Sequence, residues 1–116
     1  MLTEPRTINI LGTDVRVMFR KEADDPKLKN SVGYFDCSRS LIVIKILEPD
    51  ACSVGDLDRY QLEVLRHEII HAFLYESGMD CCSGPAESWA TNEEMVDWFA
   101  IQSPKIFKIF REQKLV

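Results

Sequence analysis

The sequence predicts one α+β domain in which a small N-terminal β-sheet precedes three helices. The first half consists of short runs of β-branched and aromatic residues separated by turn residues, whereas apolar residues recur at helical spacing in the second half. A chain of 116 residues is long enough for one hydrophobic core and too short for two lobes of similar size. We therefore expect residues 1–116 to form a single domain with strands first and helices after.

The strands are expected over residues 7–10, 14–19, 33–37 and 41–47. The segment 41–47, LIVIKIL, is the strongest of them because it is β-branched and almost continuously apolar, and Pro49 ends it. Residues 20–31 are rich in Asp and Lys and are expected to form a polar loop.

The helices are expected over residues 56–77, about 86–102 and 105–114. The first helix has one apolar stripe, and Gly78 follows it as a C-cap; the stripe comprises Leu62, Leu65, Ile69 and Phe73. Pro104 is expected to start the third helix, whose apolar residues should dock it on the body of the domain; these are Ile106, Phe107, Ile109 and Phe110.

Both histidines of the chain lie in one pentapeptide, HEIIH, at residues 67–71. On a helix His67 and His71 share a face one turn apart, so both imidazoles can bind one ion. Glu68 can then reach a water on the metal without being a ligand, as a general base must. The alternative is a chance pair on an amphipathic helix, and it is weakened because the only two histidines stand at ligand spacing. The HExxH pattern is typical of zinc peptidases.

A catalytic zinc ion commonly has three protein ligands, so a third is needed. The downstream candidates are Glu87, Glu93, Glu94, Asp97 and the cysteines Cys81 and Cys82. On the second helix Glu93 borders the apolar side, whereas Glu94 lies toward solvent. Asp97 lies one turn after Glu93 and can accept a hydrogen bond from the outer nitrogen of a ligating histidine. The competing interpretation is an acidic first turn that the helix dipole favours.

With HEIIH upstream, the segment 92–97, NEEMVD, resembles the NExxxD pattern of gluzincin metallopeptidases. The resemblance implies that Glu93 is the third zinc ligand and that Asp97 orients a histidine. The segments 65–74 and 96–100 are also similar to ImmA/IrrE-type peptidases, particularly the small phage-encoded minigluzincins. The resemblance covers residues 60–100. Before residue 50 it consists only of the order of elements, which implies a zincin-like fold.

The implied function is a zinc-dependent endopeptidase that hydrolyses a peptide or a flexible protein segment. Zn²⁺ would be held by His67, His71 and Glu93, with Glu68 as the base, and the substrate would lie extended along the sheet edge, where 41–47 is the expected strand. Larger gluzincins add a His or Tyr that stabilises the oxyanion, and no third histidine exists here. The remaining donors are Tyr34, Tyr60 and Tyr75 and, with less support, Arg39 and Arg66.

Three alternatives stay open at this point. Activity can be weak or latent, with residues 20–31 or the C-terminal tail covering the cleft. The chain can instead be a catalytically inactive zincin-like binding or regulatory module. A structural zinc site closed by Cys81 or Cys82 is the third alternative.

Composition narrows the partners and the compartment. A net charge of -5 argues against general nucleic-acid binding, and the lysines and arginine near the C-terminus are explained by a solvated helix face. The start of the chain lacks the apolar run of a secretory signal, and the longest apolar run, 41–47, is too short to span a membrane. We therefore expect a cytoplasmic protein with reduced cysteines and no membrane partner. The sequence leaves the oligomeric state open.

Overall fold

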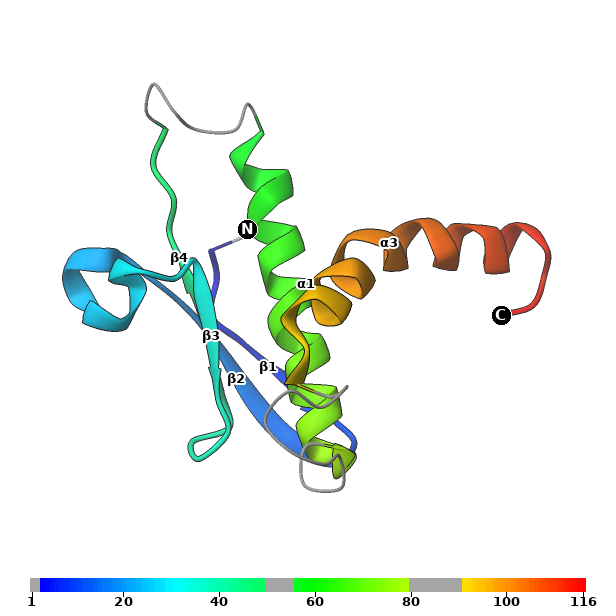
Figure 1. The fold of residues 1–116 in the computed structure, drawn as a ribbon, viewed down its shortest axis with the longest axis horizontal. Helices are drawn as coiled ribbons and strands as arrows, with labels where there is room; N and C mark the ends of the chain where they lie inside the picture. Colours follow the sequence, from blue (N-terminus) through cyan, green and yellow to red (C-terminus); the bar gives the residue numbers. More distant parts are fainter. Residues whose placement is uncertain (1–2, 50–55, 80–90) are drawn as a thin grey trace.

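A four-stranded mixed sheet forms the first half of the computed structural model, which describes residues 3–49, 56–79 and 91–116. The strands are β1 (Arg6–Ile10), β2 (Thr13–Arg20), β3 (Gly33–Asp36) and β4 (Leu41–Lys45), in the order β1-β2-β4-β3 (Figure 1). Strand β4 pairs parallel with β2 and antiparallel with β3. The four predicted strands are therefore present, within a few residues of their expected bounds.

Strand β4 is the buried centre of the sheet. Leu41, Ile42, Val43 and Ile44 are all buried, and a strand covered on both faces is expected to be continuously apolar. The expectation that this strand is the sheet edge beside the site is wrong, because β3 is the edge strand and β4 lies inside the sheet. The shorter and half-buried β3 is therefore the strand to which a further strand could be added.

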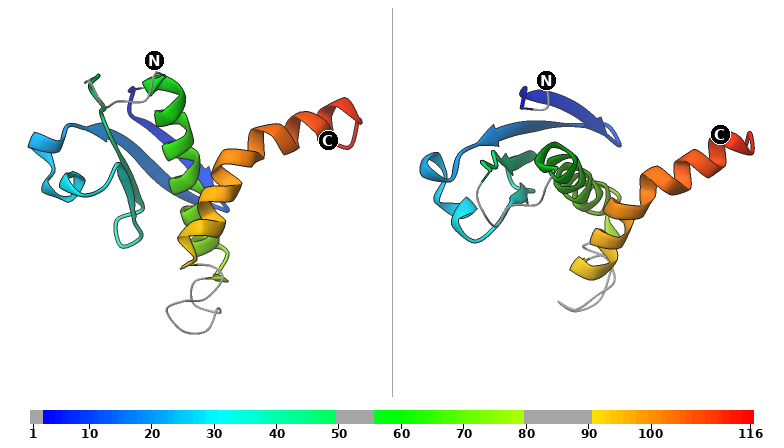
Figure 2. Two further views of the ribbon diagram at one scale, coloured as in Figure 1. Left: turned by 45° about the horizontal axis from the view of Figure 1, so that its top comes forward. Right: turned by 90° about the horizontal axis from the view of Figure 1, so that it is seen from above.

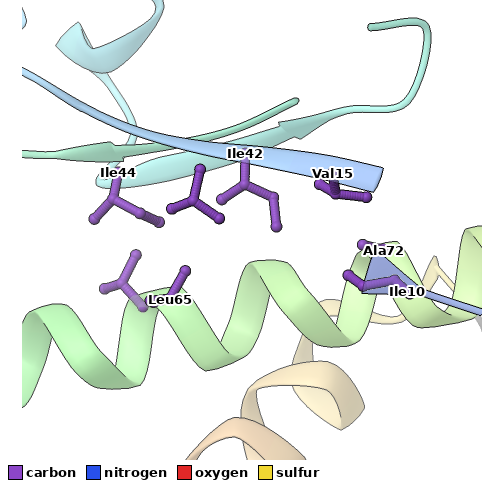
Figure 3. Close-up of a cluster of buried hydrophobic side chains, with 8 residues drawn as sticks. Ile10, Val15, Ile42, Ile44, Leu65 and Ala72 are labelled. Carbon is purple, nitrogen blue, oxygen red and sulfur yellow. The ribbon is translucent and has the colours of Figure 1, made fainter. Parts of the chain in front are cut away.

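Each face of the sheet has its own apolar cluster. On one face, Ile42 and Ile44 meet Leu65 and Ala72 of the first helix, as Figure 3 shows. On the other, Leu41 and Val43 pack with Leu28. Leu28 belongs to the second of two 3₁₀ turns, η1 (Glu22–Asp24) and η2 (Pro26–Lys29). The segment 20–31, expected as a polar loop, therefore covers the outer face of the sheet.

A buried carboxylate holds this covering segment in place. Asp25 accepts hydrogen bonds from the Tyr34 hydroxyl at 2.5 Å and from Arg20 at 3.2 Å. The Tyr34 hydrogen bond is the main reason that the pKa of Asp25 lies below its ordinary value. An ionised, paired aspartate is thus part of the packing on the face of the sheet away from the first helix.

Helix α1 (Leu57–Glu76) packs along the inner face of the sheet (Figure 2). Its N-cap, Asp56, accepts from the Arg59 N–H, and Gly78 follows with a φ of 84°. The buried face consists of Gln61, Val64, Leu65, Glu68 and Ala72. The predicted stripe is thus only partly correct, since Leu62 and Phe73 are exposed. The helix turns its Ala72 side to the sheet, where a small side chain allows close approach.

Helix α3 (Glu93–Glu112) corrects the predicted fold class. In the described ranges two long helices follow the sheet, not three, because α3 runs without a break through Pro104. Proline has no N–H for the carbonyl four residues earlier, and the Arg66 Nε donates to that oxygen of Ala100 at 2.6 Å instead. The predicted zincin-like arrangement of three helices is therefore wrong.

The second half of α3 extends away from the sheet and α1 (Figure 1). Its residues Phe107, Ile109 and Phe110 are exposed, so the prediction that they dock on the body is also wrong. Within the described ranges, no helix has the length and apolar character needed to cross a membrane.

Candidate metal site

Helix α1 presents the two histidines on one half-buried face, as predicted. His67 and His71 lie one turn apart, with ring centroids separated by 4.8 Å and an edge-to-face orientation. Neither histidine is on the face turned to the sheet, which Val64, Leu65, Glu68 and Ala72 occupy. Both rings can therefore reach the cleft beside α1.

The first turn of α3 brings Glu93 to both histidines. The Nε2 of His67 lies 3.0 Å from Glu93 Oε2, and the Nε2 of His71 lies 2.9 Å from Glu93 Oε1. The two Nε2 atoms are 3.2 Å apart. One ligand-type atom from each of the three residues thus lies within 4.8 Å of the others, and the sequence-predicted trio is brought together.

The three contacts among His67 Nε2, His71 Nε2 and the Glu93 carboxylate form a triangle, and they cannot all be hydrogen bonds. Each Nε2 carries at most one proton, so with Glu93 ionised two protons are available for three contacts. A cation at the centre would instead receive a lone pair from every corner. Nitrogen and oxygen ligands of tetrahedral zinc lie roughly 3.3–3.5 Å apart, slightly wider than the observed triangle. The three side chains therefore fit a metal ion after a shift of a few tenths of an ångström.

Asp97 lies on the outer side of His67. Its Oδ1 is 3.3 Å from His67 Nδ1, the nitrogen that faces away from the cluster. A carboxylate in this place favours a proton on Nδ1 and leaves the Nε2 lone pair free for a metal. The position agrees with the orienting role that the sequence predicted. Asn92 supports it by capping α3 with a hydrogen bond from Met95 N at 2.8 Å, which fixes where the helix begins.

Glu68 is buried beside the cluster. Its burial raises the pKa of the carboxyl from 4.5 to about 7, and Glu93 adds to the rise while His67 opposes it. A carboxyl with a pKa near neutrality exchanges protons readily at physiological pH. Glu68 is therefore chemically suited to act as a general acid and base, and it is not one of the three residues that could bind the metal.

Two grooves meet at the cluster. One, of about 730 Å³, extends past Tyr60 and Asp97, and the other, of about 400 Å³, extends past Phe35 and His71. Both are lined by Ser31, Gly33, Glu68 and Glu93. Sequence reasoning missed Ser31 and Gly33. A Cβ at Gly33 would lie 2.9 Å from Val64 Cγ1, so glycine allows β3 to approach α1 here.

Most of the predicted oxyanion donors have other contacts. The Tyr34 hydroxyl binds Asp25, Tyr75 packs its ring against Phe35 with centroids 5.8 Å apart, and Arg66 binds Ala100. Arg39 lies 3.9 Å from Asp36. Tyr60 is the described donor that lines the larger groove.

Three of the candidate ligands named from the sequence, Cys81, Cys82 and Glu87, lie outside the described residues. Glu94 is exposed and does not belong to the group that converges on the histidines. Comparison with known proteins adds nothing to this geometry: no family model, curated protein or solved structure matches the chain.

Proposed function

We propose that this protein is a zinc-dependent endopeptidase with a gluzincin-type ligand set. The observation that carries the proposal is the convergence of His67, His71 and Glu93 on one point, beside the buried Glu68. Two grooves meet at that point next to a sheet edge. The three proposed ligands, the proposed base and two grooves that could hold a substrate therefore lie together, which supports the proposal.

The donor set favours zinc among the common metals. Two imidazole nitrogens and one carboxylate are a ligand set that catalytic zinc uses, with a fourth position left open. Calcium and magnesium prefer oxygen ligands throughout. In the part of the chain that the structure describes, the group has three members, the number of protein ligands that a catalytic zinc site commonly uses.

Glu68 would perform the proton transfers. Bound zinc would supply Lewis-acid activation of a water molecule and of the scissile carbonyl. Glu68 accepts the proton of the attacking water as the C–O bond forms, and it passes that proton to the departing amine nitrogen as the C–N bond breaks. Its raised pKa suits both steps, because the carboxyl is a competent base and a competent acid near neutral pH.

The substrate would lie extended along β3. The N–H of Lys45 donates to Val32 O at 2.9 Å, and alternation along the antiparallel ladder then directs the backbone groups of Gly33 and Phe35 to the free edge. The Ser31 hydroxyl contacts both backbone groups of Gly33. Phe35 therefore offers an N–H and a C=O for strand addition, directly beside the smaller groove.

The test combines metal analysis with one substitution. Protein purified without added metal should contain about one zinc ion per chain and should cleave unstructured peptides. Glu68→Gln should keep the zinc and lose about 10²–10⁴-fold in kcat. Loss of zinc from this variant would show that Glu68 is a ligand and would contradict the assignment.

A catalytically inactive binding or regulatory module is the second candidate. It is favoured by the hydrogen bonds that occupy two of the predicted oxyanion donors, Tyr34 and Arg66. In that case the wild type would bind zinc and peptide without cleavage, and Glu68→Gln would leave peptide binding unchanged.

A further inference from the structure

The C-terminal part of the chain exposes a large apolar surface. We call residues 103–116 the arm. Its Phe107, Ile109 and Phe110 are 49%, 55% and 43% exposed. The arm projects from the body in all of the views of Figures 1 and 2. Contiguous aromatic and aliphatic residues on a projecting helix are typical of a surface that binds a partner.

The same chain contains an apolar groove at the base of the arm. The groove has a volume of about 390 Å³ and lies between α1 and α3. Its apolar lining comprises Ile69, Ile70, Phe73, Leu74, Met95 and Phe99, and it ends at Ser103. We call it the outer groove, because most of its α1 residues lie away from the face that packs on the sheet.

The arm continues the apolar wall of the outer groove. Met95, Phe99, Ser103, Ile106 and Phe110 follow one another at intervals of three or four residues, so they share one face of α3. The first three line the groove, and Phe110 is exposed beyond it. One end of this apolar stripe therefore lines the outer groove within the chain, and the other end is exposed.

Charge along α3 determines which partner fits. The arm has four cationic residues, Lys105, Lys108, Arg111 and Lys114, and one acidic residue, Glu112, for a net +3. With a total of -5, the rest of the chain carries -8. The basic arm is therefore attracted to the acidic remainder of a second copy.

We propose that two copies of this protein pair through antiparallel α3 helices, with the arm of each copy in the outer groove of the other. A two-fold axis near Ser103 places Phe107 and Phe110 of one copy against the Met95–Phe99 region of its partner. The small Ser103 allows the helices to approach where they cross. A two-fold pair uses the arm and the groove twice and leaves neither exposed. This inference does not depend on the proposed peptidase activity.

The competing occupant is an anionic membrane surface, which basic amphipathic helices also bind. The charge of -8 on the rest of the chain would oppose such binding. The observations therefore favour the acidic body of a second copy over a lipid surface.

Sedimentation equilibrium of the wild type and of Phe110→Asp tests the pairing. At a protein concentration of about 100 μM the wild type should sediment as a dimer. Phe110→Asp should weaken dimerisation on the order of 10³-fold, because the dimer loses a buried aromatic contact twice. The matched control is Leu11→Asp, which changes another exposed apolar residue, in the β1–β2 turn, and should leave the dimer intact.

A mixing experiment distinguishes arm-in-groove pairing from other contacts. Phe73→Glu alters the outer groove and should also give a monomer. Mixed with Phe110→Asp, it should form heterodimers, because the arm of the Phe73 variant meets the intact groove of the Phe110 variant. Circular dichroism establishes that both variants are folded. A monomeric wild type, a dimeric Phe110→Asp variant or the absence of heterodimers would overturn the proposal. If the monomeric wild type also bound anionic phosphatidylserine vesicles, the membrane surface would be the occupant instead.

Discussion

The two helices contribute to the candidate site in different ways. The side chains of His67 and His71 on α1 are 15% and 20% exposed, whereas those of Glu93 and Asp97 on α3 are 70% and 53% exposed. The part of the site on α1 is therefore largely buried, whereas the part on α3 is exposed at the surface. The difference indicates that a bound metal would tie the exposed Glu93 to the two better packed histidines.

The packing of each helix explains the contrast. Helix α1 packs on the sheet through its central part, with Leu65 and Ala72 against the sheet (Figure 3). Helix α3 has only Val96 and Ala100 fully buried, and its first turn depends on the Asn92 cap. Local stability is expected to follow such burial, so the α3 half should open more easily when no metal is bound.

The largest effect is expected from removing the exposed ligand. Glu93→Ala should lower zinc affinity by roughly 10²–10³-fold, if the binding free energy of a zinc site is shared about equally by four ligands. The unfolding free energy of the metal-free protein should change by less than about 0.5 kcal/mol, because the side chain is exposed. Competition with a chromogenic chelator measures the affinity.

Glu94→Ala is the matched control for that experiment. It removes the same charge from the same helical turn but does not alter the cluster, so zinc affinity should stay within a few-fold of the wild type. Equal losses in the two variants would mean that the acidic turn acts through general electrostatics, and the contrast between ligand and solvated neighbour would fail.

The next largest effect is expected at Glu68, the buried carboxyl on α1, and it is an effect on the stability of the protein. The pKa of Glu68 rises from 4.5 to about 7 in the folded protein because burial disfavours the charge. A raised folded-state pKa means that the metal-free protein loses stability as pH rises from 4.5 through 7, by about 3 kcal/mol in total. Glu68→Gln has no such charge, so it should be more stable than the wild type at pH 8.

Chemical denaturation with a chelator present checks this expectation. The unfolding free energies of wild type and Glu68→Gln should be parallel below pH 4.5 and should diverge between pH 4.5 and 7. A constant difference across this range would show that Glu68 is as well solvated as an exposed carboxylate, and that α1 does not hold its half of the site in a buried state.

Local features of the fold could be predicted from the sequence. The strands and the HEIIH helix follow from periodicity and turn residues, and the His67 to His71 spacing fixes a shared face regardless of packing. The full strand order was not accessible, although the sequence does show that β4 is more continuously apolar than β3. A continuously apolar run such as 41–47 signals a strand that is covered on both faces, and this signal pointed against the edge position that the resemblance suggested.

The error at α3 has an equally specific cause. Pro104 is a sound helix-start signal in isolation, and nothing near it in the sequence shows that the carbonyl of Ala100 has another donor. That donor, Arg66, lies 34 residues earlier on α1. A tertiary contact therefore overrode a local rule, and the same contact joins α3 to the better packed helix.

The smallest expected effect tests this contact through a double-mutant cycle. Arg66→Met should lower the unfolding free energy by about 1–2 kcal/mol, because the Ala100 carbonyl loses its donor. In a Pro104→Ala background the alanine N–H can bond that carbonyl, so the same substitution should cost less. A coupling of about 1 kcal/mol by thermal or urea denaturation would support the account. Additive effects would show that Arg66 does not compensate for Pro104, and that another interaction holds α3 continuous beside α1.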